Sequence, residues 1–264
     1  MYELSKKEYN KVSLLFKNLK VDKLAVSKAI KAHYPGRIFV DHKERPTAAL
    51  IFAGSCYVGG DAKNADFNEQ LKDLLTTEIL PGLGDEPLFI FSTTDEWKDT
   101  VNGLLKDYEV MRIKRYKFEL DPERFKEHKG WKARVPEGYD VKRADHILVK
   151  CMPNYALEYW GTADAFLTDG FGFAVTKAGE LVSVCWTMLI GKEIAELAVE
   201  TAESHRRRGL ATLAACACID HCLENSMRPE WDCFELPASM NLAQKLGFVK
   251  KLDVDVHMVR RNKL

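Results

Sequence analysis

The stretch His205–Thr212, which reads H-R-R-R-G-L-A-T, has the residue types of an anion-binding turn. It follows an apolar, strand-like segment at Ile194–Thr201 and precedes a helix-like segment that starts near Gly209. A helix start presents unpaired backbone N–H groups and the positive end of the helix dipole, and both favour a phosphate. Three arginines at that positive end would repel the dipole without an anion. The stretch predicts a phosphate site, although a basic helix start without a ligand has the same pattern.

Two carboxylates, Glu196 and Glu200, precede this turn on the strand-like segment. Side chains alternate along a strand, so residues four apart point to the same face. A carboxylate on that face could take a proton from an ammonium substrate, directly or through water. Each glutamate could equally be a solvated strand residue or one half of an ion pair, and the sequence leaves these alternatives open.

Cys216, Cys218, His221 and Cys222 have the residue types of a zinc site. On one continuous helix Cys218 and Cys222 share a face while Cys216 points elsewhere, and no second ligand pair follows at zinc-finger spacing. We therefore expect no metal and interpret these thiols as small core residues that pack against a sheet.

Composition narrows the class of protein. The 264 residues contain 39 basic and 39 acidic side chains, and this balance argues against a nucleic-acid-binding protein that uses the arginines. The first residues lack the apolar core of a secretory signal, and no run approaches the roughly 20 apolar residues of a membrane span. With seven cysteines, an odd number, we expect a reduced cytoplasmic protein that binds no membrane.

The elements that must position these residues form two similar series. In the first half, periodicity predicts a helix at Ser5–His33, a hairpin of Arg37–Asp41 with Thr47–Ala53, a helix at Asp66–Leu80, a strand at Pro87–Ser92, a helix at Trp97–Tyr108 and a strand at Val110–Leu120. In the second half, it predicts a strand at Val135–Arg143, a helix at Ala144–Met152, a hairpin of Phe171–Thr176 with Leu181–Leu189, strands at Ile194–Thr201 and Trp231–Glu235, helices at Leu210–Glu224 and Ala238–Leu246, and a last strand at Val254–Val259.

The charged segment Asp121–Arg134 separates the two series as a linker or joining helix. We predict an α/β fold of two lobes, residues 1–125 and 126–264, each a mixed, mostly antiparallel sheet flanked by helices. The halves share a pattern of elements and little residue identity.

Arg206-x-x-Gly209-x-Ala211 lies between a strand and a helix, and L-A-Q-K-L-G-F follows at Leu242–Phe248. This arrangement resembles the GNAT superfamily of acyl-CoA-dependent N-acyltransferases, across the whole carboxyl-terminal half. More narrowly, G-F-G-F-A-V, W-D-C and L-A-Q-K-L-G-F resemble a bacterial GNAT group that includes zwittermicin A resistance proteins.

The resemblance implies an acetyl-CoA site and a set of roles. The pantetheine arm would add to the edge of the Ile194–Thr201 strand, and backbone N–H groups of the turn would bind the pyrophosphate. The implied coenzyme-binding residues are Leu197, Ala198, Val199, Thr201, Arg206, Arg207, Arg208, Gly209, Leu210, Ala211 and Thr212. Glu196 lies nearest the position of the general base in several relatives, and Glu200 is the second candidate.

Two departures affect the mechanism. Relatives often have an asparagine where this chain has Leu236, and many have a tyrosine, the acid that protonates the leaving thiolate, where it has Ala243. Ser239, a thiol or water could donate that proton instead, or the reaction needs no acid.

The first half has no matching phosphate turn, because D-A-K-N-A-D-F stands in its place. We interpret that half as a degenerate GNAT-like lobe.

The sequence thus predicts an N-acetyltransferase that moves the acetyl group of acetyl-CoA to a primary amine, with a small molecule as the acceptor. The alternative is a non-catalytic acyl-CoA-binding or regulatory module. The expected partner is the amine acceptor, and the sequence does not decide whether the protein forms a homodimer.

Overall fold

The computed structural model describes residues 1–157 and 159–261, and they form two compact units. The first contains Met1–Arg115 together with the segment that starts at Val254, and the second contains Tyr116–Asp253. These bounds differ from the expected 1–125 and 126–264. The difference arises because β6 (Glu109–Leu120) and β12 (Phe248–Arg260) each run through both units, and the end of β12 pairs with a strand of the first.

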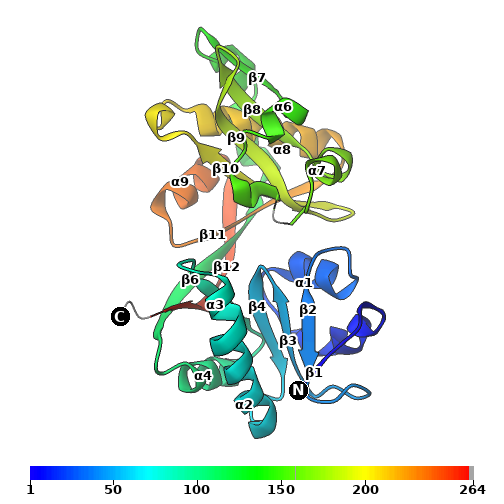
Figure 1. The fold of residues 1–264 in the computed structure, drawn as a ribbon. Coiled ribbons are helices and arrows are strands. Elements are labelled where there is room, and N and C mark those ends of the chain that lie inside the picture. Colours follow the sequence, from blue (N-terminus) through cyan, green and yellow to red (C-terminus); the bar gives the residue numbers. More distant parts are fainter. Residues whose placement is uncertain (158, 262–264) are drawn as a thin grey trace. The chain divides into compact units, whose positions relative to one another are not determined.

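The first unit is a mixed sheet with helices on its faces (Figure 1). Its strands lie in the order β1-β2-β3-β4-β5-β12-β6, and β4 and β5 run parallel while the other registers given for this unit are antiparallel. Besides β6 and β12, its elements are β1 (Tyr2–Glu3), η1 (Lys6–Phe16), α1 (Lys23–Ile30), β2 (Arg37–Val40), β3 (Ala48–Ala53), β4 (Ser55–Gly60), α2 (Ala65–Leu74), η2 (Leu75–Ile79), α3 (Leu80–Gly82), β5 (Leu88–Ser92) and α4 (Asp95–Leu104).

Alternating residues of these strands bury both faces of the sheet. Leu50, Val58 and Ile90 pack against α2 and α4 through Phe67 and Trp97. The opposite face meets η1 and α1, where Gly59 lies close to the backbone of η1. Burial on two faces explains why these strands read as continuous apolar runs.

The second unit repeats this plan with different side chains. Its strands follow the order β6-β11-β10-β9-β8-β7, with β10 and β11 parallel and β10-β9-β8-β7 antiparallel. Its elements are α5 (Pro122–Phe125), η3 (Lys126–His128), η4 (Trp131–Arg134), β7 (Tyr139–Arg143), α6 (His146–Val149), η5 (Asn154–Leu157), α7 (Ala163–Asp169), β8 (Gly172–Lys177), β9 (Glu180–Ile190), β10 (Ile194–Thr201), η6 (Glu203–His205), α8 (Leu210–Glu224), β11 (Arg228–Phe234) and α9 (Pro237–Lys245).

Helix α8 covers one face of the second sheet, and α6, η5 and α7 cover the other (Figure 1). On the α8 face, Cys216, Cys218 and Cys222 are fully buried, and the Cys218 thiol donates to the Cys185 carbonyl at 3.1 Å. The expectation that these thiols are core residues is confirmed. In the described part of the chain, no group of three His, Cys, Asp or Glu side chains could hold a metal ion. Within the same residues, no helix is both long enough and apolar enough to cross a membrane.

The prediction of one continuous helix at Ser5–His33 is wrong, because the helix is interrupted in its middle. The structure has a 3-10 helix η1 and a separate α1, and Asp22 between them adopts a left-handed φ of 54°. The Tyr57 hydroxyl donates to the Asp22 carboxylate at 3.2 Å, so a contact distant in sequence stabilises the break. The sequence prediction also omitted β4, whose C-Y-V-G-G segment pairs with both β3 and β5.

The expected elements of the second half are mostly present, with corrected bounds. Strand β7 begins at Tyr139 and helix α6 spans only His146–Val149, so both are shorter than expected. The segment Asp121–Arg134 holds three short helices rather than one joining helix. The last strand starts six residues earlier than expected, at Phe248.

His257 on β12 is a buried histidine of the first unit. It lies opposite Ile90 of β5 and is 1% exposed, and among the described residues neither ring nitrogen has a hydrogen-bond partner. Burial lowers its pKa from 6.5 to about 4, and the charges of Arg112 and Lys98 add to the effect of burial, against the opposing charges of Asp255 and Asp99. Between pH 6.5 and about 4, the His257 ring is therefore neutral in the folded protein, whereas the same ring in the unfolded chain is protonated.

We expect acid to destabilise the protein through His257. As pH falls below 6.5, the unfolded chain binds a proton that the folded state does not, so the free energy of unfolding falls until pH is near 4. The full loss is roughly 3 kcal/mol, at about 1.4 kcal/mol per pKa unit. Urea unfolding between pH 7 and pH 5 measures the slope above the range in which carboxylates such as Asp41 also take up protons. His257→Leu should remove most of this slope and His33→Gln, at an exposed position, should keep it; an unchanged slope in His257→Leu would contradict the assignment.

Candidate active site

Strands β10 and β11 separate shortly after β10 begins. β10 pairs with β9 from Ala195 to Thr201, but its parallel register with β11 covers only Ile194, Ala195 and Glu196. The register with β9 shifts between Glu196 and Leu197, and such bulges increase local twist. Across the described residues, the β10 edge that faces β11 therefore has no strand partner after Glu196. Apart from the Thr201 carbonyl, which accepts from Arg206, its backbone groups are available to an extended ligand.

The turn after β10 leads into a helix start without a side-chain cap. Gly209 is the N-cap of α8 with φ of 79°, and the first turn of α8 holds no acidic residue. Arg207 also adopts a left-handed φ, of 62°. A carbon added at Gly209 would meet nothing within 4 Å, so the turn requires glycine for its dihedral angle and not for space. The N–H groups at the start of α8 thus face an open, exposed turn.

The arginines of this turn differ in their contacts. Arg206 donates to the Thr201 carbonyl at 3.2 Å and lies 3.6 Å from the Glu200 carboxylate. Arg208 donates to the Tyr139 hydroxyl and to the Ser204 carbonyl. The hydrogen bonds to the Thr201 and Ser204 carbonyls hold the turn in shape, and all three guanidinium groups remain exposed beside the helix start. The local field therefore favours an anion.

Glu200 lies in a hydrogen-bonded pair beside a cavity. The Tyr155 hydroxyl of η5 donates to a Glu200 carboxylate oxygen at 2.7 Å, and the Tyr155 ring tilts against Trp186 at 5.8 Å. Burial and this hydrogen bond raise the pKa of Tyr155, so its hydroxyl stays protonated. The cavity, of about 380 Å³, is lined by Cys151, Met152, Pro153, Asn154, Leu181, Val182, Ser183, Val184, Glu200 and Ala202.

Glu196 lies at the point where β10 and β11 separate, opposite Glu230. Glu230 is 2% exposed and accepts from Lys117 of β6 at 2.6 Å and from Arg228 at 3.0 Å. Burial alone would lower the pKa of Lys117, but the hydrogen bond to Glu230 and nearby acidic charges, that of Glu196 among them, outweigh it and raise that pKa. Glu196 therefore adjoins a buried network of charged side chains.

Glu196 and Glu200 point to the same face of β10. The residues between them alternate: Leu197 and Val199 pack into the core under α8, and Ala198 packs with Trp186 on the opposite face. Ser239, the third expected catalytic residue, lies elsewhere. Its hydroxyl accepts from the Trp231 indole at 3.0 Å, and Trp231 belongs to the core on the α8 side. The sheet therefore separates Ser239 from the face that carries the two glutamates.

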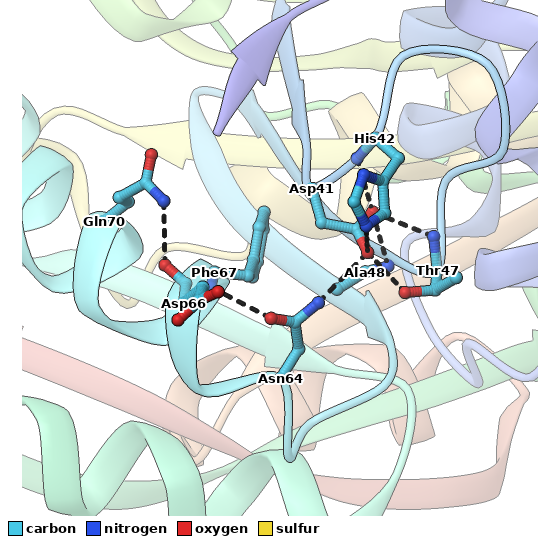
Figure 2. A network of polar contacts seen from close by, with 8 residues as sticks. All are labelled: Asp41, His42, Thr47, Ala48, Asn64, Asp66, Phe67 and Gln70. Atoms are coloured by element: carbon cyan, nitrogen blue, oxygen red, sulfur yellow. Dashed lines mark hydrogen bonds and ion pairs between the residues drawn. The ribbon is translucent and has the colours of Figure 1, made fainter.

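The first unit has an equivalent strand–helix–strand segment, β4-α2-β5, but its helix start is closed. The Asn64 side chain caps α2 by accepting from the Phe67 N–H at 3.1 Å, and it donates to Asp41 at 3.1 Å (Figure 2). Asp66 adds a negative charge in the first turn. A phosphate would have to displace the cap and approach two carboxylates.

Asp41 itself is held as a carboxylate. It accepts from the backbone N–H groups of His42, Thr47 and Ala48 at 2.9 to 3.1 Å and from the Thr47 hydroxyl (Figure 2). Burial would raise the pKa of Asp41, but these hydrogen bonds outweigh burial and lower it. Within the described residues, the open helix start at Gly209 thus has no counterpart at α2.

Comparison with protein families identifies the family of this chain and its class of enzyme. The family profile of GNAT acetyltransferases matches residues 14–256, which is most of the chain. The chain belongs to the GNAT acetyltransferase family. This GNAT acetyltransferase is accordingly an acyltransferase, and its match extends across both compact units.

Individual relatives agree with the family. The GNAT acetyltransferase is 29% identical over 255 residues to an uncharacterised N-acetyltransferase of Bacillus subtilis, YdfB, with 94% of each chain covered. A GCN5-related N-acetyltransferase-like protein from Streptococcus suis superposes with a TM-score of 0.76 at 21% identity, covering 96% of this chain and 99% of that one. A tandem GNAT protein of the clavulanic acid biosynthesis pathway gives 0.61 at 14% identity, covering 99% and 98%. The fold is therefore that of tandem GNAT-like lobes.

Sequence reasoning missed two parts of this GNAT acetyltransferase's candidate site. Tyr155 lies on a single turn of 3-10 helix, in a segment without periodicity. The Lys117–Glu230 pair joins strands that are far apart in the sequence. Both residues are identified by a hydrogen bond in the folded protein, Tyr155 to Glu200 and Lys117 to Glu230, and the order of residue types along the chain does not predict either bond.

Proposed function

We propose that the chain transfers the acetyl group of acetyl-CoA to a primary amine of a small molecule. The observation that carries this proposal is the β10 edge that is unpaired from Leu197 to Thr201 and leads directly into the uncapped start of α8. The pantetheine amides would bond to that edge, and the pyrophosphate would accept from the N–H groups of the turn. GNAT enzymes use acetyl-CoA, and the tandem relative from the clavulanic acid pathway was itself solved without it.

The proposed reaction is a direct attack. The ammonium of the acceptor gives a proton to Glu196, the neutral amine attacks the thioester carbonyl carbon, and the C–S bond breaks. The second N–H proton passes to the coenzyme A sulfur or to water. Glu196 is the better candidate for the base, since it lies where the strands separate, at the start of the edge to which the pantetheine arm would bond.

Ser239 has no place in this scheme as the acid, because it is bonded to Trp231 on the α8 side of the sheet. A thiolate is a good leaving group and needs no protein acid. The narrower resemblance to zwittermicin A resistance proteins stays a prediction, and it favours a small-molecule acceptor.

Release of free thiol tests the proposal. Acetyl-CoA is incubated with the protein and a panel of primary amines, and the coenzyme A thiol is measured with a disulfide dye. We expect amine-dependent thiol release together with a product that is heavier by one acetyl group. Coenzyme A binding without thiol release for any amine would instead support the acyl-CoA-binding alternative.

A further inference from the structure

We infer that the acceptor carries two ammonium groups, and that Glu200 with Tyr155 holds the one that does not react. This inference rests on the proposed function and specifies its substrate class. It starts from the cavity of about 380 Å³ beside β10, in which Glu200 is the one charged lining residue among those described. The remaining lining groups are apolar or neutral, so the cavity suits a cation with an apolar chain and disfavours a carboxylate or phosphate.

The spacing of the two glutamates sets the form of the acceptor. Glu196 and Glu200 share a face of β10, and four residues of extended strand span about 13 Å. The small side chain of Ala198 lies between them, above the buried Trp186. An extended acceptor can therefore follow β10, with its reacting nitrogen at Glu196 and a second ammonium at Glu200. A monoamine would use one of these carboxylates and leave the other unoccupied.

The surroundings of Glu200 fit an ammonium group. Tyr155 donates to one carboxylate oxygen and leaves lone pairs for a further donor. Tyr155 is 46% exposed beside the carboxylate, and the face of an aromatic ring attracts a cation. Arg206 lies 3.6 Å from Glu200, but both side chains are about half exposed, and an ion pair at such a position contributes little. An incoming ammonium can therefore replace Arg206.

The test compares acceptors that differ in their second cation. We expect kcat/KM to fall in the order spermidine, putrescine, n-butylamine, with at least a tenfold difference between the first and the last. Glu200→Gln should lower kcat/KM for spermidine at least tenfold more than for n-butylamine. The matched control is Glu180→Gln, which removes an exposed carboxylate at the start of β9, outside the cavity lining, and should keep the wild-type ratio.

A second readout does not depend on turnover. Cys151 lines the same cavity and is exposed, and the other six cysteines are buried. Spermidine should slow alkylation of Cys151 by iodoacetamide, n-butylamine should slow it less, and Cys151→Ser should remove the labelled site. Equal kcat/KM for spermidine and n-butylamine, or an unchanged ratio in Glu200→Gln, overturns the inference while leaving acetyl transfer intact. If no amine releases thiol from a protein that binds coenzyme A, the proposed function itself has failed.

Discussion

Gly209→Glu should weaken the binding of coenzyme A on the order of a hundredfold. When another residue replaces glycine, the free turn can leave the left-handed angle, and restoring that angle on binding costs about 1–2 kcal/mol. The glutamate carboxylate is itself attracted to the positive start of α8 and repels a phosphate there, which costs the bound state about 1 kcal/mol or more. Together these amount to roughly 3 kcal/mol, and each 1.4 kcal/mol changes a dissociation constant tenfold. Isothermal calorimetry with coenzyme A measures the effect.

Gly209→Asn separates the two causes in this prediction. Asparagine tolerates a positive φ, and the position has room for a side chain. We expect this neutral variant to bind coenzyme A close to wild type. Unchanged affinity in Gly209→Glu would show that the pyrophosphate does not bind at the start of α8. Equal losses in both variants would mean that the backbone angle, and not the charge, controls binding.

Glu196→Gln should lower kcat about a hundredfold or more, which is the usual contribution of a general base. The amide keeps the size of the side chain and cannot accept the proton of the ammonium group. Because the coenzyme contacts in the proposal are made by the β10 backbone and the turn, the dissociation constant of coenzyme A should stay near wild type. Stopped-flow thiol release at saturating amine gives kcat, and calorimetry gives the dissociation constant.

The pH dependence of the Glu196→Gln variant distinguishes a base from a structural residue. If Glu196 takes the proton, the residual rate should rise with pH as more of the amine becomes neutral in solution, and the variant should approach wild type at high pH. A variant that is equally slow at all pH values has lost structure and not a base. If Glu196→Gln and Glu200→Gln both retain full rate at neutral pH, neither carboxylate is the base.

The parts of the site that the sequence predicted are local in the chain. A strand, a turn with glycine and a helix of small residues follow one another within Ile194–Glu224, and each has its own periodicity or turn chemistry. The same locality explains the correct interpretation of Cys216, Cys218 and Cys222 as core residues, since helical spacing alone places them.

The parts that the sequence could not predict depend on strand order. Lys117 forms a hydrogen bond with Glu230 because β6 and β11 are neighbouring strands. The two residues are 113 positions apart in the sequence, and no pattern of residue types predicts that their strands are neighbours. The break at Asp22 depends on a hydroxyl from β4, and β4 itself was omitted because C-Y-V-G-G is short and ends in glycines. His257 is ambiguous in sequence, and only its position opposite Ile90 shows that it is buried.

The route of β12 has a consequence for synthesis of the chain. The first unit is discontinuous, because its β5 pairs with residues 257–259, about 170 positions later. As the chain leaves the ribosome, β5 presents an unpaired edge until nearly all of the second unit has been made, and unpaired edges invite association with other chains. Pairings over such distances also slow folding. The unit that is synthesised first is thus the unit that is completed last.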